Sequence, residues 1–219
     1  MKDARLQTAP TSKSLAEQAY DKLSVMILER ELFSGTFIVE ERLAEQLNIS
    51  RTPMREAILR LAAQGLLVRA GTRSYAVRTV TAAEFFQSHK VREWLEPEAI
   101  ELSTGKIPHD VIDDLCEDIR VLANADVQEH AHWQIDDRLH TMFAEASGNK
   151  VLAKIAGEIR VTTRLFEISK PARRVKKDGE EHLAILEAFR ADNIKVARKA
   201  MVKHIRNLVA DTAAILQGL

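Results

Sequence analysis

Apolar positions in the first third of the chain follow a helical period. Residues 15–30 place apolar side chains three or four positions apart behind Ser14, a residue type that caps helices. A short second helix fits residues 40–47. A third helix follows Ser50, its expected N-cap, with Pro53 in the first turn, where the missing N–H of proline does no harm. The pattern therefore predicts three consecutive helices.

Two short segments after the third helix have the character of strands. Residues 66–69 and 75–78 are mostly apolar and flank a turn that contains Gly71, which predicts a β-hairpin. Three helices followed by a hairpin form the layout of a winged helix-turn-helix.

From Thr81 onward the pattern is helical to the end, and turn residues divide it into about six helices. Aromatic residues make up only 5% of the chain, which also favours helix over sheet. The predicted fold class is mainly α. The expected parts are a flexible N-terminal arm, a winged helix-turn-helix and an all-helical bundle, over residues 1–13, 14–80 and 81–219 respectively.

Composition and charge argue against a membrane or secreted protein but do not indicate a function. No apolar run reaches the ~18 residues of a membrane helix, and the N-terminus lacks the apolar core of a signal peptide. The single cysteine, Cys116, cannot form an internal disulfide, which suits a reducing cytoplasm. The net charge is zero, and residues 1–79 hold 12 Lys and Arg against 9 Asp and Glu. That excess is too small to indicate nucleic acid by itself.

The exposed face predicted for the third helix gathers groups that suit DNA. Arg51 and Arg55 are four residues apart and project from one side, opposite the apolar stripe. Arg is well shaped for bidentate bonds to guanine, and the N–H groups of a helix N-terminus can hold a phosphate. On charge alone, a solvated basic helix is the plainer alternative. The DNA-compatible residues at or along this helix are Ser50, Arg51, Thr52, Arg55 and Arg60, and the hairpin adds positive charge through Arg69, Arg73 and Arg78.

Residues 43–61, LAEQLNISRTPMREAILRL, resemble the DNA-binding motif of GntR-family regulators, over a long and ungapped match. The resemblance implies that the start of the third helix contacts operator bases or phosphates. Two departures stand out. Glu41 occupies a position that is basic in many relatives, next to Arg42, and the wing tip has one glycine in residues 71–74. The expected DNA-binding residues are Arg42, Ser50, Arg51, Thr52, Arg55, Arg60 and Arg73.

Seven histidines all follow residue 80, and four of them (His89, His109, His130 and His132) lack a pattern of partners and are expected to be surface or packing residues. Asp136 and His140 are four residues apart and share a helix face, while His182 and His204 fall in two further predicted helices. One carboxylate and three imidazoles would suit a transition metal. From spacing alone, the absence of a metal site is the favoured interpretation, because only Asp136 and His140 are shown by their spacing to lie together.

Residues 133–149 and 181–189 resemble the FCD ligand-binding domain of the FadR-type branch of the GntR family. Many members of that branch bind a divalent metal through one Asp and three His. The resemblance assigns these ligands to Asp136, His140, His182 and His204. Asp137 faces about 100° away from Asp136 and is the weaker candidate. Zinc is the first expectation, with nickel, manganese or iron as alternatives.

A metal with open coordination positions could take a small carboxylate, a group that arginine also binds bidentately. Arg92 matches an arginine common in the first helix of such domains, and Arg160 and Arg164 are further candidates. Each could instead form a salt bridge, as Arg92 could with Glu96 four residues on.

The leading hypothesis is a cytoplasmic regulator, expected to be a repressor and not an enzyme. It would bind double-stranded DNA as a homodimer on a short pseudo-palindromic operator, without a membrane partner. A small organic acid at the metal site would change its operator affinity. A metal-dependent hydrolase and a metal-free sensor of acyl-CoA are the alternatives. No general base stands out for the first, and the full Asp/His set argues against the second.

Overall fold

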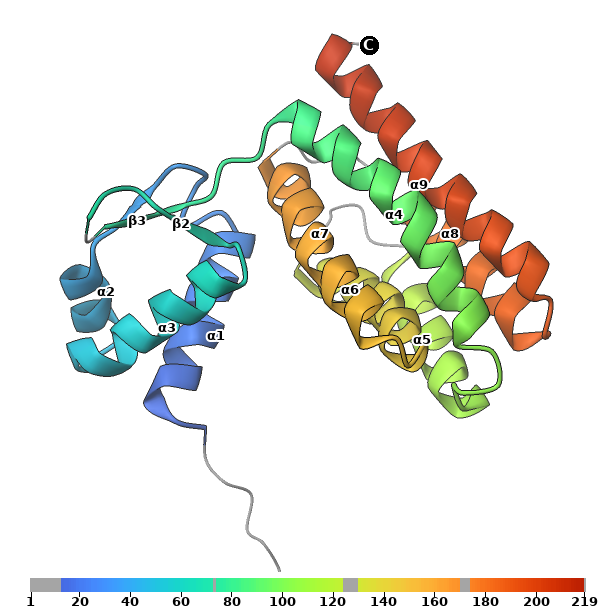
Figure 1. Cartoon of the computed structure of the whole chain (residues 1–219), viewed down its shortest axis with the longest axis horizontal. Coiled ribbons are helices and arrows are strands. Elements are labelled where there is room, and N and C mark those ends of the chain that lie inside the picture. Colours follow the sequence, from blue (N-terminus) through green and yellow to red (C-terminus); the bar gives the residue numbers. More distant parts are fainter. Residues whose placement is uncertain (1–12, 73, 124–129, 170–173, 219) are drawn as a thin grey trace, which may run out of the picture.

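The structure is a computed structural model, which describes residues 13–72, 74–123, 130–169 and 174–218 (Figure 1). Residues 1–12 of the expected arm and Arg73 of the wing lie outside the described residues. The described residues form nine α-helices and one small antiparallel sheet. In chain order the elements are α1 (Leu15–Leu28), β1 (Phe37–Ile38), α2 (Glu40–Gln46), α3 (Arg51–Ala63), β2 (Leu67–Arg69), β3 (Tyr75–Val77), α4 (Ala82–Leu102), α5 (His109–Leu122), α6 (His130–Ala146), α7 (Lys150–Ser169), α8 (Val175–Arg190) and α9 (Ile194–Gln217).

Both predicted N-cap residues, Ser14 and Ser50, begin a helix, but only Ser14 makes a capping hydrogen bond with its side chain. Ser14 begins α1 with a capping box, in which its hydroxyl accepts from the N–H of Glu17 and its own N–H donates to the Glu17 carboxylate. Ser50 occupies the N-cap of α3 with an extended backbone, but its side chain makes no capping bond. Its exposed hydroxyl and the first N–H groups of α3 therefore remain available to a partner in solution.

The sheet has three strands in the order β1-β3-β2, with Val68 opposite Ala76 and Phe37 opposite Ala76 on the other side. The hairpin of β2 and β3 is the predicted one. The third strand, β1, was not predicted, because two residues are too few to show alternation. Its neighbour Gly35 adopts a positive φ and donates its N–H to the Val77 carbonyl, which turns the chain into the sheet edge.

In the C-terminal part, the described residues form a bundle of six helices, in agreement with the prediction of about six. The helix α4 begins at a second capping box, formed by Thr81 and Glu84, and contacts α6, α7 and α9. Figure 1 shows α9 running beside α4, with α7 and α6 on the other side of α4. Among the helices of the described residues, none combines the length and apolar character needed to cross a membrane.

One end of α7 joins the two parts of the molecule. Leu165, Phe166 and Ile168 belong to the same buried cluster as the cores of α1 and α3, and Phe166 stacks on Phe85 of α4. Arg78 also connects the two parts across this contact, which we call the seam, because its Nη1 donates to Oγ1 of Thr162 on α7 at 3.0 Å. Its guanidinium thus pairs at the seam, and among the described arginines expected to add positive charge to the hairpin, Arg69 is the one that lies exposed.

Candidate metal and effector site

Four potential metal ligands converge in the interior of the bundle. Asp136 and His140 come from α6, His182 from α8 and His204 from α9. Each offers one ligand atom, and these atoms all lie within 4.8 Å of one another. The three histidines are buried. The structure therefore brings together the whole set that the resemblance to the FCD domain assigns to a metal.

The ring nitrogens of the cluster surround one carboxylate oxygen. Nε2 of His182 lies 3.4 Å from Oδ1 of Asp136, and Nε2 of His140 lies 3.5 Å from the same oxygen. Nε2 of His204 completes the group at 3.3 Å from Nε2 of His182. Three aromatic nitrogens and an oxygen are the donor set that zinc and its neighbours in the first transition series prefer.

Carboxylates behind two of the histidines orient the rings. Nδ1 of His140 lies 2.5 Å from Oε2 of Glu96, and Nδ1 of His204 bonds Oε2 of Glu181 at 2.9 Å. A carboxylate beside Nδ1 holds the proton there and leaves the lone pair on Nε2, which is the tautomer that binds a metal. Arg92 and His140 outweigh burial and keep the pKa of Glu96 well below its usual range.

Two further observations fit a cation at this point. Both ring nitrogens of His140 are buried and make no hydrogen bond among the described residues; Nδ1 is in ionic contact with Glu96, which leaves Nε2 for a cation. Burial, with repulsion from His204, holds the pKa of His182 well below its usual value, so that ring is neutral and its lone pair is free for a metal. The residues therefore fit a divalent transition metal.

The arginines near the cluster are paired with carboxylates of the protein. Nη2 of Arg160 lies 2.7 Å from Oδ2 of Asp136, and Arg164 contacts the same oxygen. Asp137 turns its Oδ1 to both arginines rather than to the histidines. Nε of Arg92 donates to Oε1 of Glu96 at 2.6 Å, the salt bridge that its sequence spacing allowed. Although burial would raise the pKa of Asp136, Arg160 and Arg164 keep it well below its usual range.

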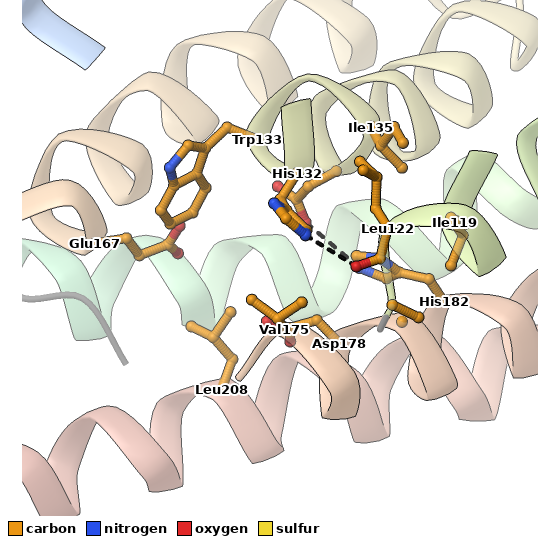
Figure 2. Close-up of a pocket in the computed structure, with 13 residues that line it drawn as sticks. Ile119, Leu122, His132, Trp133, Ile135, Glu167, Val175, Asp178, His182 and Leu208 are labelled. Atoms are coloured by element: carbon orange, nitrogen blue, oxygen red, sulfur yellow. Dashed lines mark hydrogen bonds and ion pairs between the residues drawn. The ribbon is translucent and has the colours of Figure 1, made fainter. Parts of the chain in front are cut away.

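A pocket of about 50 Å³ opens beside the cluster and shares Asp136 and His182 with it (Figure 2). That space exceeds the roughly 10–15 Å³ that one water needs, and it suits a small molecule. Nε2 of His132 lies 3.1 Å from the carbonyl of Leu122 on its rim. The other lining residues are Ile119, Ala123, Trp133, Ile135, Glu167, Val175, Asp178, Gly179 and Leu208.

The exposed face of α3 carries the predicted DNA-reading residues. Arg51, Thr52 and Arg55 are exposed at its N-terminal end. Arg51 contacts Glu41 of α2, and Nε of Arg55 lies 3.7 Å from Oε2 of Glu40. Arg60 and Arg42, which are also predicted to contact DNA, are exposed as well, and the Arg60 guanidinium lies 4.5 Å above the ring of Tyr20.

Comparison with known proteins gives the family. The model for bacterial regulatory proteins of the gntR family matches residues 15–77, and the FCD domain model matches residues 87–207. The chain belongs to the GntR family and carries an FCD domain. The helical FCD domain therefore holds the Asp/His cluster, and the winged helix-turn-helix holds α3.

The relatives of this GntR regulator are transcription regulators, and the sequence match extends along most of each chain. It is 26% identical to the Nta operon transcriptional regulator of Aminobacter aminovorans, over 84% of this chain and 88% of that protein. It is also 26% identical to an HTH-type regulator in an unstable DNA locus of Streptomyces ambofaciens, over 90% and 84%. The structure of McbR/YncC from E. coli superposes with a TM-score of 0.76 at 21% identity, over 94% and 100%, and supports the fold.

Three residues of the FCD pocket were missed by reasoning from the sequence. Trp133 precedes Asp136 by three positions, and Asp178 precedes His182 by four, so each shares a helix face with a predicted ligand. Inspection of the neighbouring turns would have found both. Glu167 follows Arg164 by three positions on α7 and could have been found in the same way.

Proposed function

We propose that this DNA-binding regulator of the GntR family is a repressor whose operator affinity is set by a small carboxylate bound at a divalent metal in the FCD domain. The observation that carries the proposal is the convergence of Asp136, His140, His182 and His204, with carboxylates behind two of the rings. A bound divalent metal would supply a Lewis acid with open coordination positions. Zinc is the first candidate, and nickel, manganese and iron share the same ligands.

The size and polarity of the pocket support a small effector. About 50 Å³ beside the cluster cannot hold an acyl-CoA, which argues against a metal-free sensor of that class. Arg160 and Arg164 serve this function indirectly. By pairing with Oδ2 of Asp136, they keep the carboxylate ionised and turn Oδ1 toward the histidines.

The DNA-reading step belongs to α3. Arg51, Thr52 and Arg55 are exposed at the helix end that would enter the major groove, where arginine reads guanine. One such helix covers only a few base pairs, so we propose a homodimer on a short pseudo-palindromic operator.

Communication between the two sites is proposed to pass through the end of α7. Arg164 contacts Asp136 and Glu167 lines the pocket, while Leu165 and Phe166, between them in sequence, pack in the core that contains α3. A ligand that moves this turn would also move the winged helix-turn-helix. It must bind the DNA-competent and DNA-incompetent states unequally to do so.

The test begins with selection of a duplex from a random library by the full-length protein. The affinity for that duplex is then measured by fluorescence anisotropy with zinc-loaded and chelator-treated protein, with and without acetate, lactate, succinate and citrate. We expect a two-fold symmetric selected site and a carboxylate that weakens DNA binding in the loaded protein but not in His182→Ala. Equal effects on the loaded protein and the variant, or no effect of any acid, would contradict the proposal.

A further inference from the structure

The charged groups that line the effector pocket are carboxylates. Asp136, Glu167 and Asp178 line it, and none of the described lining residues is Lys or Arg. Figure 2 shows Glu167 beside Trp133 on one side and Asp178 near His182 on the other. A carboxylate ligand would therefore find no basic side chain in the wall of the pocket, and only the metal would attract it.

The charges in contact around the cluster do not balance. Six carboxyl groups contact four guanidiniums. With every carboxyl ionised and the histidines neutral, two negative charges remain for a divalent metal to neutralise, although burial raises the pKa of Asp178. The carboxylates are Glu96, Asp136, Asp137, Glu167, Asp178 and Glu181, and the arginines are Arg92, Arg160, Arg164 and Arg174. Asp211 and Lys177, which extend the network, cancel each other. A simple carboxylate would make the loaded site negative again, whereas a zwitterion would not.

Asp178 is placed to receive a positive group. Arg174 contacts its Oδ1 at 2.9 Å but also contacts Glu181 and Asp211, so one guanidinium charge is shared among three carboxylates. The other oxygen, Oδ2, has no hydrogen-bond partner among the residues that the structure describes. Asp178 lies one turn before His182 on α8, about 6 Å along the helix axis, which is short enough for one small molecule to reach both.

The remainder of the pocket surface is apolar. Ile119, Leu122, Val175 and Leu208 provide aliphatic contacts, and Trp133 provides an aromatic one. This surface suits a short hydrocarbon side chain and offers little to a polyhydroxylated acid.

We propose that the effector is a small α-amino acid with an aliphatic side chain, whose ammonium group binds Asp178 while its carboxylate occupies the metal site. The inference rests on the proposed function, because it assumes that a carboxylate binds at the metal. The ammonium group compensates the acidic wall, and the side chain lies against Leu122 and Leu208.

Matched pairs of ligands test the proposal. Binding of alanine and propanoate, valine and 3-methylbutanoate, and leucine and 4-methylpentanoate to the zinc-loaded full-length protein is measured by calorimetry and by thermal shift. We expect the amino acid of at least one pair to bind about tenfold or more tightly than its desamino partner, the effect of one charge-assisted hydrogen bond. Asp178→Asn should remove that preference, and Glu187→Gln, an exposed acid on the same helix, should keep it.

The wild-type comparison decides the ligand class even if Asp178→Asn is unstable. Desamino acids that bind as well as the amino acids in every pair would overturn this inference and leave the proposed function intact. The same holds if no member of any pair binds but another carboxylate does. Absence of metal-dependent binding by every acid would instead overturn the proposed function.

Discussion

Oε2 of Glu181 lies 2.9 Å from Nδ1 of His204, on the opposite edge of the ring from Nε2, which faces His182. Glu181 is itself held, because Nδ2 of Asn207 donates to its Oε1 at 2.7 Å and Arg174 contacts its Oε2. The position of this imidazole is thus fixed by a carboxylate that has fixed partners of its own.

Glu181→Gln should weaken metal binding by about 10–100-fold, because a neutral amide oxygen accepts the proton on Nδ1 of His204 more weakly than a carboxylate does. Competition with a chromophoric zinc chelator measures the affinity. Glu187→Gln on the same helix is the matched control, since Glu187 contacts Arg120 away from the cluster. Equal affinities of the two variants would show that Glu181 does not support the metal.

The sequence predicted local relationships better than distant ones. The i, i+4 spacing of Asp136 and His140 was visible, but spacing alone could not show that α8 and α9 bring His182 and His204 to the same point. That step came from the resemblance to the FCD domain, and the structure agrees with it geometrically. A two-residue strand such as β1 carries too little pattern to be read in advance.

The partners of the arginines near the cluster could not be predicted from the sequence. Arg160 and Arg164 were expected to face an effector, yet they bind Asp136 and Asp137 across the contact of α6 with α7. Pairing between helices depends on their packing, which residue spacing within one helix does not contain. For Arg92 the spacing allowed two outcomes, and the structure has the salt bridge with Glu96.

Arg51→Ala and Arg55→Ala should each weaken specific operator binding by about 1–3 kcal/mol and lower its salt dependence by about one unit for each lost phosphate contact. Anisotropy titrations of the selected duplex at several salt concentrations measure both quantities. Arg120→Ala, an exposed arginine on α5 of the FCD domain, is the control. If either substitution in α3 leaves affinity and salt slope at the level of the control, that arginine does not read DNA.

Glu41→Gln should strengthen DNA binding severalfold. Glu41 contacts Arg51 in the DNA-free structure and adds a negative charge beside the expected path of the phosphates. The gain should shrink in an Arg51→Ala background, because part of it comes from releasing that arginine, and a double-mutant cycle measures this. A gain of the same size in both backgrounds would mean that Glu41 acts on the phosphates alone.

Arg78→Ala should reduce the effect of an effector on DNA affinity while metal affinity stays unchanged. The side chain joins the two domains through Thr162 of α7 and Glu84 of α4, and neither of these contacts involves a residue of the Asp/His cluster. The ratio of operator affinities with and without the active carboxylate is the readout. Arg69→Ala on β2 tests the neighbouring strand without the seam contact. Equal ratios for Arg78→Ala and wild type would exclude a role of this contact in communication.

His89 should make the stability of the protein depend on pH. The side chain is 1% exposed, its ring packs edge-on against Phe85, and its Nε2 lies 3.5 Å from Oε1 of Glu167. Burial lowers the pKa of His89 to about 4, despite the opposing effect of Glu167. The folded protein therefore keeps this ring neutral over a range in which the unfolded chain, with an ordinary pKa of about 6.5, takes up a proton.

The contribution of His89 is complete above pH 6.5 and is lost as the pH falls toward 4, because the unfolded state gains the proton first. The loss amounts to about 3 kcal/mol at most, at about 1.4 kcal/mol per pKa unit. Chemical denaturation of chelator-treated wild type and His89→Gln at pH 7.5 and 4.5 measures it, since the remaining titrating groups are common to both proteins. The wild type should lose more stability than the variant over this interval. Parallel losses would show that His89 is already protonated in the folded state or exposed in solution.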